Sequence, residues 1–275
     1  MKQCMAPLVG ARRLGPGLFL HTYQEADIAA QARPGQFVNV RVSGATVPLL
    51  RRPFSICDAD PAAGRLSALF QVVGEGTEAL ARADVGDVID VVGPLGKSFP
   101  WEGAKRALLV GGGVGVAPLY FLASRAHRAR LAGVEGPKVI FAYGARSAEG
   151  LALAEEIEPR VDELAIATED GSRGRKGLVT DLLGPYLDGD CEVFCCGPRP
   201  MMAGVLGLMR LRGIKKGWFS LENQMGCGVG VCLGCVVPTR DGYRRVCCDG
   251  PVLPAAILDS GFGFHGISHR SGDGE

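Results

Sequence analysis

The sequence predicts three structural parts: an N-terminal antiparallel β-barrel, a doubly wound α/β domain with a parallel sheet, and a small C-terminal loop domain rich in cysteine. Three observations predict this order. Short β-like runs with turn residues between them fill residues 1 to about 100, strands alternate with helical stretches from about residue 105, and a cysteine cluster follows. The expected limits are 1–102 for the barrel, 103–215 for the α/β domain, 216–260 for the cysteine domain and 261–275 for a flexible tail.

The barrel is expected from five strand-like runs: "LFLHTYQ", "QFVNVRVSG", "PFSICD", "LSALFQVVG" and "DVIDVVG". Turn residues separate these runs, among them Pro34-Gly35, Gly64 and Gly86-Asp87. Short strands without long helical periods between them favour a closed antiparallel barrel. A short helix is expected only near Thr77 to Ala83.

The α/β domain is expected from "RALLVGGGVGVAPLYFLASRAHRARL", which is an apolar strand, a glycine turn and a helix. The runs "VIFAYGAR", "ELAIAT" and "CEVFCCG" follow as buried strands, with helical stretches between them. Glycines at such a turn let the backbone approach a pyrophosphate at a helix N-terminus. The turn lacks the complete G-x-G-x-x-G spacing, so a tight turn without a ligand remains an alternative.

The cysteine domain is expected from a spacing typical of one metal centre. Cys227, Cys232 and Cys235 read C-x4-C-x2-C, and another cysteine follows after eleven or twelve further residues, at Cys247 or Cys248. This is the plant-type [2Fe–2S] pattern, whereas structural zinc sites usually pair two short C-x2-4-C knuckles. Interleaved glycines let a loop turn tightly and direct backbone N–H groups at the sulfurs. We therefore expect a [2Fe–2S] cluster, with zinc as the alternative metal.

The fourth ligand is ambiguous from the residues alone. A strand that begins at Tyr243 would place Arg245 and Cys247 on one face and Cys248 on the other, which does not choose between the two thiols. The remaining cysteines fit inert buried thiols better than ligands, and those we assign this role are Cys4, Cys57, Cys191 and Cys195.

Composition and charge exclude several kinds of partner. The 275 residues are 47% hydrophobic, enough for two domain cores, and 30 lysines and arginines balance 29 acidic residues. This balance favours neither nucleic acid nor an anionic membrane as a partner. Residues 1–30 lack the basic and apolar regions of a signal peptide, and no apolar run reaches the length of a membrane span. We expect a cytoplasmic, reducing location, where clustered cysteines bind metal more often than each other.

Two motifs resemble those of the ferredoxin–NADP reductase family. "RRPFSI" at 51–56 resembles its R-x-[YF]-[ST] flavin motif, and "CCGPRPMM" at 195–202 resembles its C-G-P-x-x-M nicotinamide motif. The resemblance implies that the barrel binds FAD, that the α/β domain binds a pyridine nucleotide, and that hydride passes between them.

The resemblance also implies site residues. Arg52 would offer a cationic fork to the FAD pyrophosphate, Phe54 a flat wall for the isoalloxazine, and Ser55 a hydrogen bond near its reactive edge. "FQVVGEGTEAL" at 70–80 looks like the second flavin segment, where Gly76 and Thr77 would give backbone and hydroxyl contacts to phosphate. The FAD candidates are Arg52, Pro53, Phe54, Ser55, Leu69, Phe70, Gln71, Gly76 and Thr77. The nucleotide candidates are Gly111, Gly112, Gly113, Gly115, Pro118, Cys196, Gly197 and Pro198.

The cysteine segment narrows the resemblance. "LENQMGCGVGVCLGC…RRVCCDGPV", with "GPLGKSF" at 93–99 and "TEDGSRGRKGLVTDLL" at 168–183, resembles the electron-transfer subunits of two-subunit, NAD-linked dihydroorotate dehydrogenases, from about Pro34 to Val252. Aligned on that family's V-C-x-D-G-P, the fourth ligand is Cys247, and the cluster ligands are Cys227, Cys232, Cys235 and Cys247. The vicinal Cys248 is a departure from the family pattern.

The resemblance implies an electron relay in de novo pyrimidine (UMP) biosynthesis. Dihydroorotate would reduce FMN on a catalytic partner subunit, and electrons would cross the cluster and FAD to NAD+. The chain would then contain no catalytic residue for dihydroorotate itself. A heterotetramer of two catalytic and two electron-transfer subunits is implied, with residues 222–250 at the interface because the electron donor sits on another polypeptide.

Two alternatives remain open. One is the small subunit of an NADH-dependent ferredoxin–NADP+ oxidoreductase or sulfide dehydrogenase, whose relatives often use a carboxylate in place of one cysteine ligand. The other is a zinc-containing, non-catalytic assembly protein, which predicts a colourless product. The residues also leave NAD and NADP open, because Arg146 could approach a 2′-phosphate and Glu149 a free ribose hydroxyl. NAD is the nucleotide that the resemblance implies.

Overall fold

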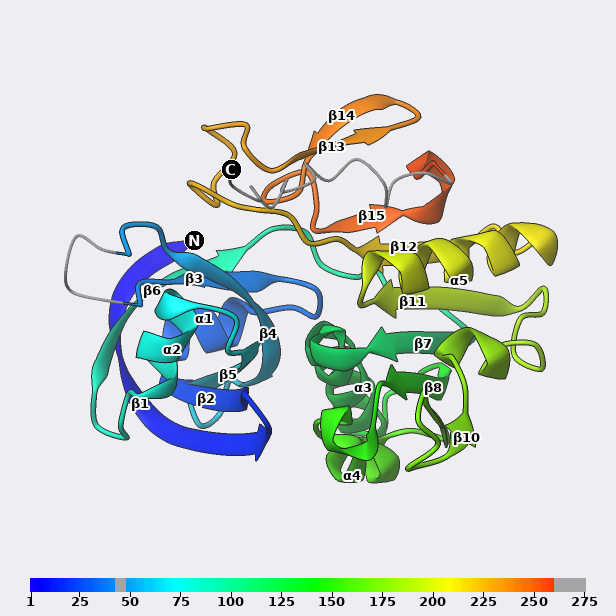
Figure 1. Ribbon diagram of the computed structural model, residues 1–275, viewed down its shortest axis with the longest axis horizontal. Coiled ribbons are helices and arrows are strands. Elements are labelled where there is room, and N and C mark those ends of the chain that lie inside the picture. Colours follow the sequence, from blue (N-terminus) through cyan, green and yellow to red (C-terminus); the bar gives the residue numbers. More distant parts are fainter. Residues whose placement is uncertain (43–47, 260–275) are drawn as a thin grey trace, which may run out of the picture.

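The computed structural model describes residues 1–42 and 48–259, so the tail expected at 261–275 lies outside the described residues. The barrel lies beside the α/β domain, and the C-terminal segments cross over both (Figure 1). Among the described residues, no helix combines the length and the apolar character needed to cross a membrane.

The predicted antiparallel barrel is confirmed. It closes with six strands in the order β1-β2-β5-β4-β3-β6. The strands are β1 (Lys2–Gly15), β2 (Leu18–Gln24), β3 (Phe37–Val40), β4 (Arg52–Asp60), β5 (Arg65–Gln71) and β6 (Val88–Leu95), with helices α1 (Ala26–Gln31) and α2 (Glu75–Ala81) between them. Strand β1 and helix α1 were not expected from the sequence. The helix expected near Thr77 is present as α2, two residues earlier.

Strand β3 has two different faces, as the alternation of side chains along a strand requires. Val38 and Val40 pack in the barrel core, whereas Phe37 belongs to a second core that also contains Cys235 and Cys247. Asn39 shares the outward face with Phe37. The barrel wall therefore also supports the cysteine segment.

The parallel-sheet domain is confirmed as well. Its seven-stranded sheet has the order β10-β9-β8-β7-β11-β12-β15. The strands are β7 (Arg106–Gly112), β8 (Lys138–Ala145), β9 (Glu163–Thr168), β10 (Arg175–Lys176), β11 (Cys191–Cys196), β12 (Gly217–Ser220) and β15 (Val252–Pro254), and only the β12–β15 pair is antiparallel. The helices are α3 (Val116–Leu131), the short α4 (Ala154–Ile157) and α5 (Arg199–Leu211).

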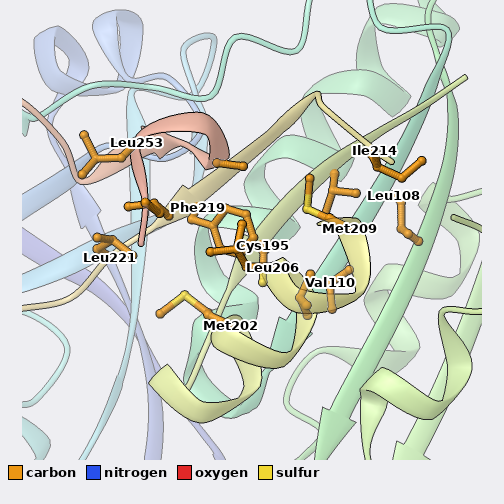
Figure 2. Close-up of a cluster of buried hydrophobic side chains, with 14 of the residues drawn as sticks. Leu108, Val110, Cys195, Met202, Leu206, Met209, Ile214, Phe219, Leu221 and Leu253 are labelled. Atoms are coloured by element: carbon orange, nitrogen blue, oxygen red, sulfur yellow. The ribbon is translucent and has the colours of Figure 1, made fainter. Parts of the chain in front are cut away.

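Helix α5 covers one face of this sheet. Its Met202, Leu206 and Met209 side chains are buried against residues of the central strands, among them Val110 and Cys195 (Figure 2). Cys195 is fully buried, and burial raises the pKa of its thiol, as it does for Cys57 in the barrel. Such thiols resist ionisation and stay unreactive.

The C-terminal segment contributes strands to two different sheets. The hairpin of β13 (Val236–Thr239) and β14 (Gly242–Arg245) stands apart as a two-stranded sheet above the rest (Figure 1). Strands β12 and β15 also fall within 216–260, the range expected for the cysteine domain, yet they complete the edge of the parallel sheet. The domain limits themselves stay a prediction.

The expected strand from Tyr243 through Cys248 is wrong beyond Arg245. Residues 246–249 form turns, in which the backbone N–H groups of Cys248 and Asp249 donate to the Arg245 carbonyl oxygen at 3.3 and 2.9 Å. Strand alternation therefore does not decide which face Cys247 and Cys248 occupy.

Candidate functional site

The glycine turn and the C-G-P motif meet at a topological switch point. From β7 the chain builds β8, β9 and β10 on one side and then places β11 on the other side of β7. In open α/β sheets, ligands bind outside the carboxyl ends of the strands where the order reverses. At that place Cys196 pairs in register with Gly111.

The two motifs touch through their backbones. A Cβ on Gly115 would lie 2.6 Å from both the Cys196 carbonyl oxygen and the Gly197 Cα, and a Cβ on Gly112 would lie 2.5 Å from Met201 Sδ. No side chain fits between them without movement. The glycines therefore allow the glycine turn and the C-G-P motif to stay in contact at the switch point.

A tyrosine supports the glycine turn. The Tyr143 hydroxyl of β8 donates to the Gly113 carbonyl oxygen at 3.2 Å and contacts that of Gly150 at 3.4 Å. Gly113 has a φ of 53°, in the left-handed region that favours glycine. Sequence reasoning missed Tyr143, because a tyrosine in the apolar run "VIFAYGAR" is indistinguishable from a core residue.

The remaining nucleotide candidates lie close to this turn. Pro118 is buried in the first turn of α3, and Pro198 directly precedes α5. Burial raises the pKa of the Cys196 thiol, although a hydrogen bond with Ser220 on the neighbouring strand β12 opposes that shift. Cys196 is thus a neutral thiol at the carboxyl edge of the sheet.

The flavin candidates on β4 and α2 also converge. The Arg52 guanidinium lies against Gly76, where a Cβ would come within 3.0 Å of Arg52 Nε and 3.1 Å of Nη2. Arg52 Nη1 donates to the Leu50 carbonyl oxygen at 2.6 Å. A cationic fork and the beginning of α2 thus lie side by side, as a pyrophosphate requires.

The Thr77 hydroxyl, which was expected to contact phosphate, hydrogen-bonds to the protein backbone instead. This hydroxyl donates to the Gly74 carbonyl oxygen at 2.9 Å and accepts from the N–H groups of Val73 and Gly74. One donor and two acceptor positions are all that a hydroxyl offers. Its side chain therefore shapes the turn before α2, and a phosphate contact from this residue would come from its backbone N–H.

Aromatic side chains line the barrel behind the flavin motif. The half-buried Phe54 ring lies 5.3 Å from Phe70, which stacks on Phe19 at 5.7 Å. Leu69 and Phe70 are buried, while Gln71 is exposed. In the β3–β4 ladder Pro53 pairs with Asn39 and Ser55 with Phe37, so the flavin motif is hydrogen-bonded to the strand that supports the cysteine segment.

The four candidate cluster ligands form two contacting pairs. Cys227 Sγ accepts hydrogen bonds from the N–H groups of Val229 at 3.4 Å and Cys232 at 3.5 Å. Cys235 Sγ accepts one from the Cys247 N–H at 3.4 Å. The Cys232 and Val229 donors lower the pKa of Cys227 to about 6, whereas burial raises the pKa of Cys247 to about 12.

Cys248 follows Cys247 in the same turn, and its thiol also faces the cysteine loop. Its Sγ would be 2.7 Å from a Cβ on Gly230, and it contacts Asp249 Oδ1 at 3.9 Å. Arg245 holds this turn, because its guanidinium pairs with the Asp249 carboxylate at 3.0 and 3.1 Å and donates to the Gly230 carbonyl oxygen at 3.1 Å. The cysteine loop and the turn are thus joined by one arginine.

The donor set fits a [2Fe–2S] cluster, whose two irons need four thiolates. Across residues 1–42 and 48–259, no three histidine, cysteine, aspartate or glutamate side chains are yet close enough together to hold a metal ion. Cys227, Cys232, Cys235 and Cys247 would hold the cluster, and its binding would order the loop, since metal binding and ordering of a site are coupled. The chain's ten cysteines are all free thiols.

Two known families match parts of this chain. Residues 222–259 match the family described as the iron-sulfur cluster binding domain of dihydroorotate dehydrogenase B, and residues 109–206 match the oxidoreductase NAD-binding domain.

Two relatives that align over most of this chain share one name. Dihydroorotate dehydrogenase B (NAD(+)), electron transfer subunit, from Bacillus cereus (strain Q1) is 37% identical over 256 residues, which cover 90% of this chain and 95% of the relative. The subunit of that name from Bacillus mycoides (strain KBAB4) is 40% identical over 240 residues, covering 84% of this chain and 88% of the relative.

Solved structures share the fold. An NADH-dependent reduced ferredoxin–NADP oxidoreductase, studied for flavin-based electron bifurcation, superposes with a TM-score of 0.80 at 30% identity, over 93% of this chain and 90% of that one. A ferredoxin NADP+ reductase from Neisseria gonorrhoeae with bound FAD and NADP gives a TM-score of 0.64 at 15% identity, over 78% of this chain and 92% of that one, which supports the fold alone.

Proposed function

This chain belongs to the family of dihydroorotate dehydrogenase B (NAD(+)) electron transfer subunits, and from this premise we propose that it relays electrons from a dihydroorotate-oxidising partner to NAD+ in pyrimidine biosynthesis. It is an oxidoreductase subunit whose cofactors are FAD, a [2Fe–2S] cluster and NAD. When bound, the cluster exchanges single electrons, and FAD converts between single electrons and the hydride that NAD+ accepts.

One observation carries this proposal: the cysteine segment packs on the barrel strand next to the flavin motif. Phe37 of β3 shares a hydrophobic core with Cys235 and Cys247, and the same Phe37 pairs with Ser55 of the flavin motif. A redox centre in the loop and a flavin on β4 would therefore be neighbours. A structural zinc loop has no need of this placement.

The chain's residues then divide into three tasks. Arg52 would hold the FAD pyrophosphate beside Gly76, and Phe54 and Ser55 would lie along the isoalloxazine. The switch point between β7 and β11 would hold the nucleotide against backbone that no side chain obstructs. The thiolates of the two cysteine pairs would bind the cluster, and the N–H groups directed at Cys227 would stabilise its negative charge.

The electron donor in this proposal is an FMN on a separate catalytic subunit, in a complex of two catalytic and two electron-transfer chains. Its docking surface would be the cysteine loop, where two apolar side chains close together in sequence are exposed: Val231 is 80% exposed and Leu233 58%. Leu233 also has a φ of 58°, a left-handed backbone conformation that is unfavourable for leucine. Its exposed side chain gains no packing within this chain that would compensate for this strain. We place the relay in the cytoplasm because the ligand thiols must stay reduced.

Introducing a charge on this surface tests the docking. Val231→Asp is expected to weaken binding of the catalytic subunit at least about 10-fold, since a charge in the core of an interface must be desolvated. Calorimetric titration of the purified subunits measures this effect, with iron content as a check on the loop. Val134→Asp is the control, because Val134 is 58% exposed and lies three residues after the end of α3, outside the cysteine loop. If wild type, Val231→Asp and Val134→Asp bind the catalytic subunit with equal affinity, the cysteine loop is not the docking surface.

A second function rests on the structural neighbour with a TM-score of 0.80, an NADH-dependent ferredoxin–NADP oxidoreductase. In that case the flavin and cluster would serve a different partner. The greater identity of the dihydroorotate dehydrogenase relatives, 37% and 40% against 30%, favours the first proposal.

Reconstitution separates these functions. The chain, purified without air, is expected to show flavin and iron–sulfur absorption that bleaches with NADH. Mixed with an FMN-containing dihydroorotate dehydrogenase catalytic subunit, it is expected to give dihydroorotate-dependent formation of NADH. Colourless, zinc-containing protein would overturn the relay, and coloured protein without dihydroorotate activity would support the second function.

A further inference from the structure

We propose that Asn39 is a positioning residue of the relay, which holds the Cys227 end of the cysteine loop on the barrel strand beside the flavin motif. The inference rests on the proposed function and adds to it a residue that links the two redox sites. Asn39 lies in β3 and belongs to none of the motifs described above.

Two contacts join Asn39 to the loop. Its Nδ2 donates to the Cys227 carbonyl oxygen at 3.5 Å, across 188 residues of sequence. Nδ2 would also lie only 2.6 Å from a Cβ on Gly228, so the loop backbone passes directly over the amide. Gly228 has a φ of 72°, which glycine adopts without strain. A candidate ligand and the residue after it therefore both touch Asn39.

The same residue lies next to the flavin side. Asn39 pairs with Pro53 in the β3–β4 ladder, and the neighbouring pair joins Val38 to Phe54. Through the backbone of one strand pair, Asn39 connects the expected isoalloxazine wall to the expected cluster. The distance between the two redox sites then depends on this contact.

Stability alone does not explain an asparagine here. Asn39 is 2% exposed, and its Oδ1 is buried without a hydrogen-bond partner among the described residues. A buried acceptor without a partner costs about 1–3 kcal/mol, and an apolar residue of similar shape would avoid that cost. The neighbouring outward side chains, Phe37 and Leu95, are apolar and already supply the packing. The amide instead fixes how the loop is seated on the strand, a role that buried polar groups have in some proteins.

The experiment compares how fast electrons leave the flavin with how fast they enter it. Full-length wild type, Asn39→Leu and Asn39→Asp are purified without air and mixed with NADH in a stopped-flow spectrometer. Flavin bleaching reports entry of the hydride, and cluster bleaching reports transfer across β3. Thermal unfolding and the electron paramagnetic resonance spectrum of the reduced cluster are recorded on the same samples.

We expect normal flavin reduction in both variants. Cluster reduction is expected to slow at least about 10-fold, as for other groups that orient a metal ligand from outside its coordination sphere. Asn39→Leu is expected to unfold at the wild-type temperature or above it, because it removes an unpaired buried oxygen. Slower transfer in a protein of undiminished stability is a result that a merely structural role would not produce.

Gln24→Leu is the matched control. Gln24 Nε2 also donates to backbone carbonyl oxygens, those of Ala63 at 2.9 Å and Gly64 at 3.0 Å, but these contacts join the end of β2 to the turn before β5 and touch no candidate cofactor residue. It is expected to transfer electrons at the wild-type rate. If Asn39→Leu also keeps the wild-type rate and cluster spectrum, the inference is overturned. If wild type itself lacks flavin, cluster or NADH reduction, the proposed function fails and the inference with it.

Discussion

Replacement of Cys247 by alanine is expected to abolish the [2Fe–2S] cluster, whereas replacement of Cys248 by alanine is expected to leave it in place. Cys247 is 2% exposed and contacts Cys235 through its backbone N–H, while Cys248 is directed at Gly230 and Asp249. Loss of an outer group that orients a ligand already costs about 10- to 100-fold in metal affinity, and loss of a ligand costs more.

Iron and acid-labile sulfide per chain, with the visible spectrum, measure this prediction. Cys247→Ala should fall to background in both assays and keep its flavin bands, because the flavin candidates lie in the barrel. Cys248→Ala should match wild type. The reverse result would assign the fourth ligand to Cys248, and retention of the cluster in both variants would show that either thiol of the turn suffices.

Gly115→Ala is expected to weaken NADH binding about 5- to 150-fold, which corresponds to the 1–3 kcal/mol that overpacking usually costs. The reason is steric. A Cβ would lie 2.6 Å from backbone atoms of Cys196 and Gly197, and backbone cannot rotate away as a side chain can. The glycine turn and the C-G-P motif would have to separate at the place where the nucleotide is expected.

Titration of flavin bleaching with NADH measures the binding change. Gly207→Ala is the control in the same domain, because nothing lies within 4 Å of a Cβ at Gly207 and alanine is the better helix former in α5. Its binding should equal that of wild type, and flavin content should be unchanged in both variants. An unchanged NADH affinity in Gly115→Ala would place the nucleotide elsewhere.

The elements that the sequence predicted correctly are those with a strong local pattern. β2, β5 and β6 are short runs rich in apolar residues between turn signals, and the glycine turn between β7 and α3 is explicit in "GGGVGVAP". Strand β1 was missed because most of its side chains are exposed, so its alternation is weak. Helix α1 has six residues, too few to show a helical period.

The candidate site residues also separate into those with a local sequence signal and those without one. Cysteine spacing, the R-x-F-S tetrapeptide and the C-G-P motif are local signals, and each was available from the residues. Tyr143 and Asn39 carry no such signal. The first looks like a core residue, and the second like a polar residue within an apolar strand, until the partners that they contact are known.

The sequence by itself determined which chemical groups this protein carries: a set of clustered thiols, a flavin motif, two nucleotide motifs and the order of the domains. Only the tertiary structure decided how they meet. It placed β11 next to β7, ended β14 at Arg245 so that Cys247 and Cys248 lie in a turn, and seated the cysteine loop on β3. The physical reason is that spacing and side-chain chemistry are local properties, whereas strand order and packing between distant segments depend on the free energy of the whole folded chain.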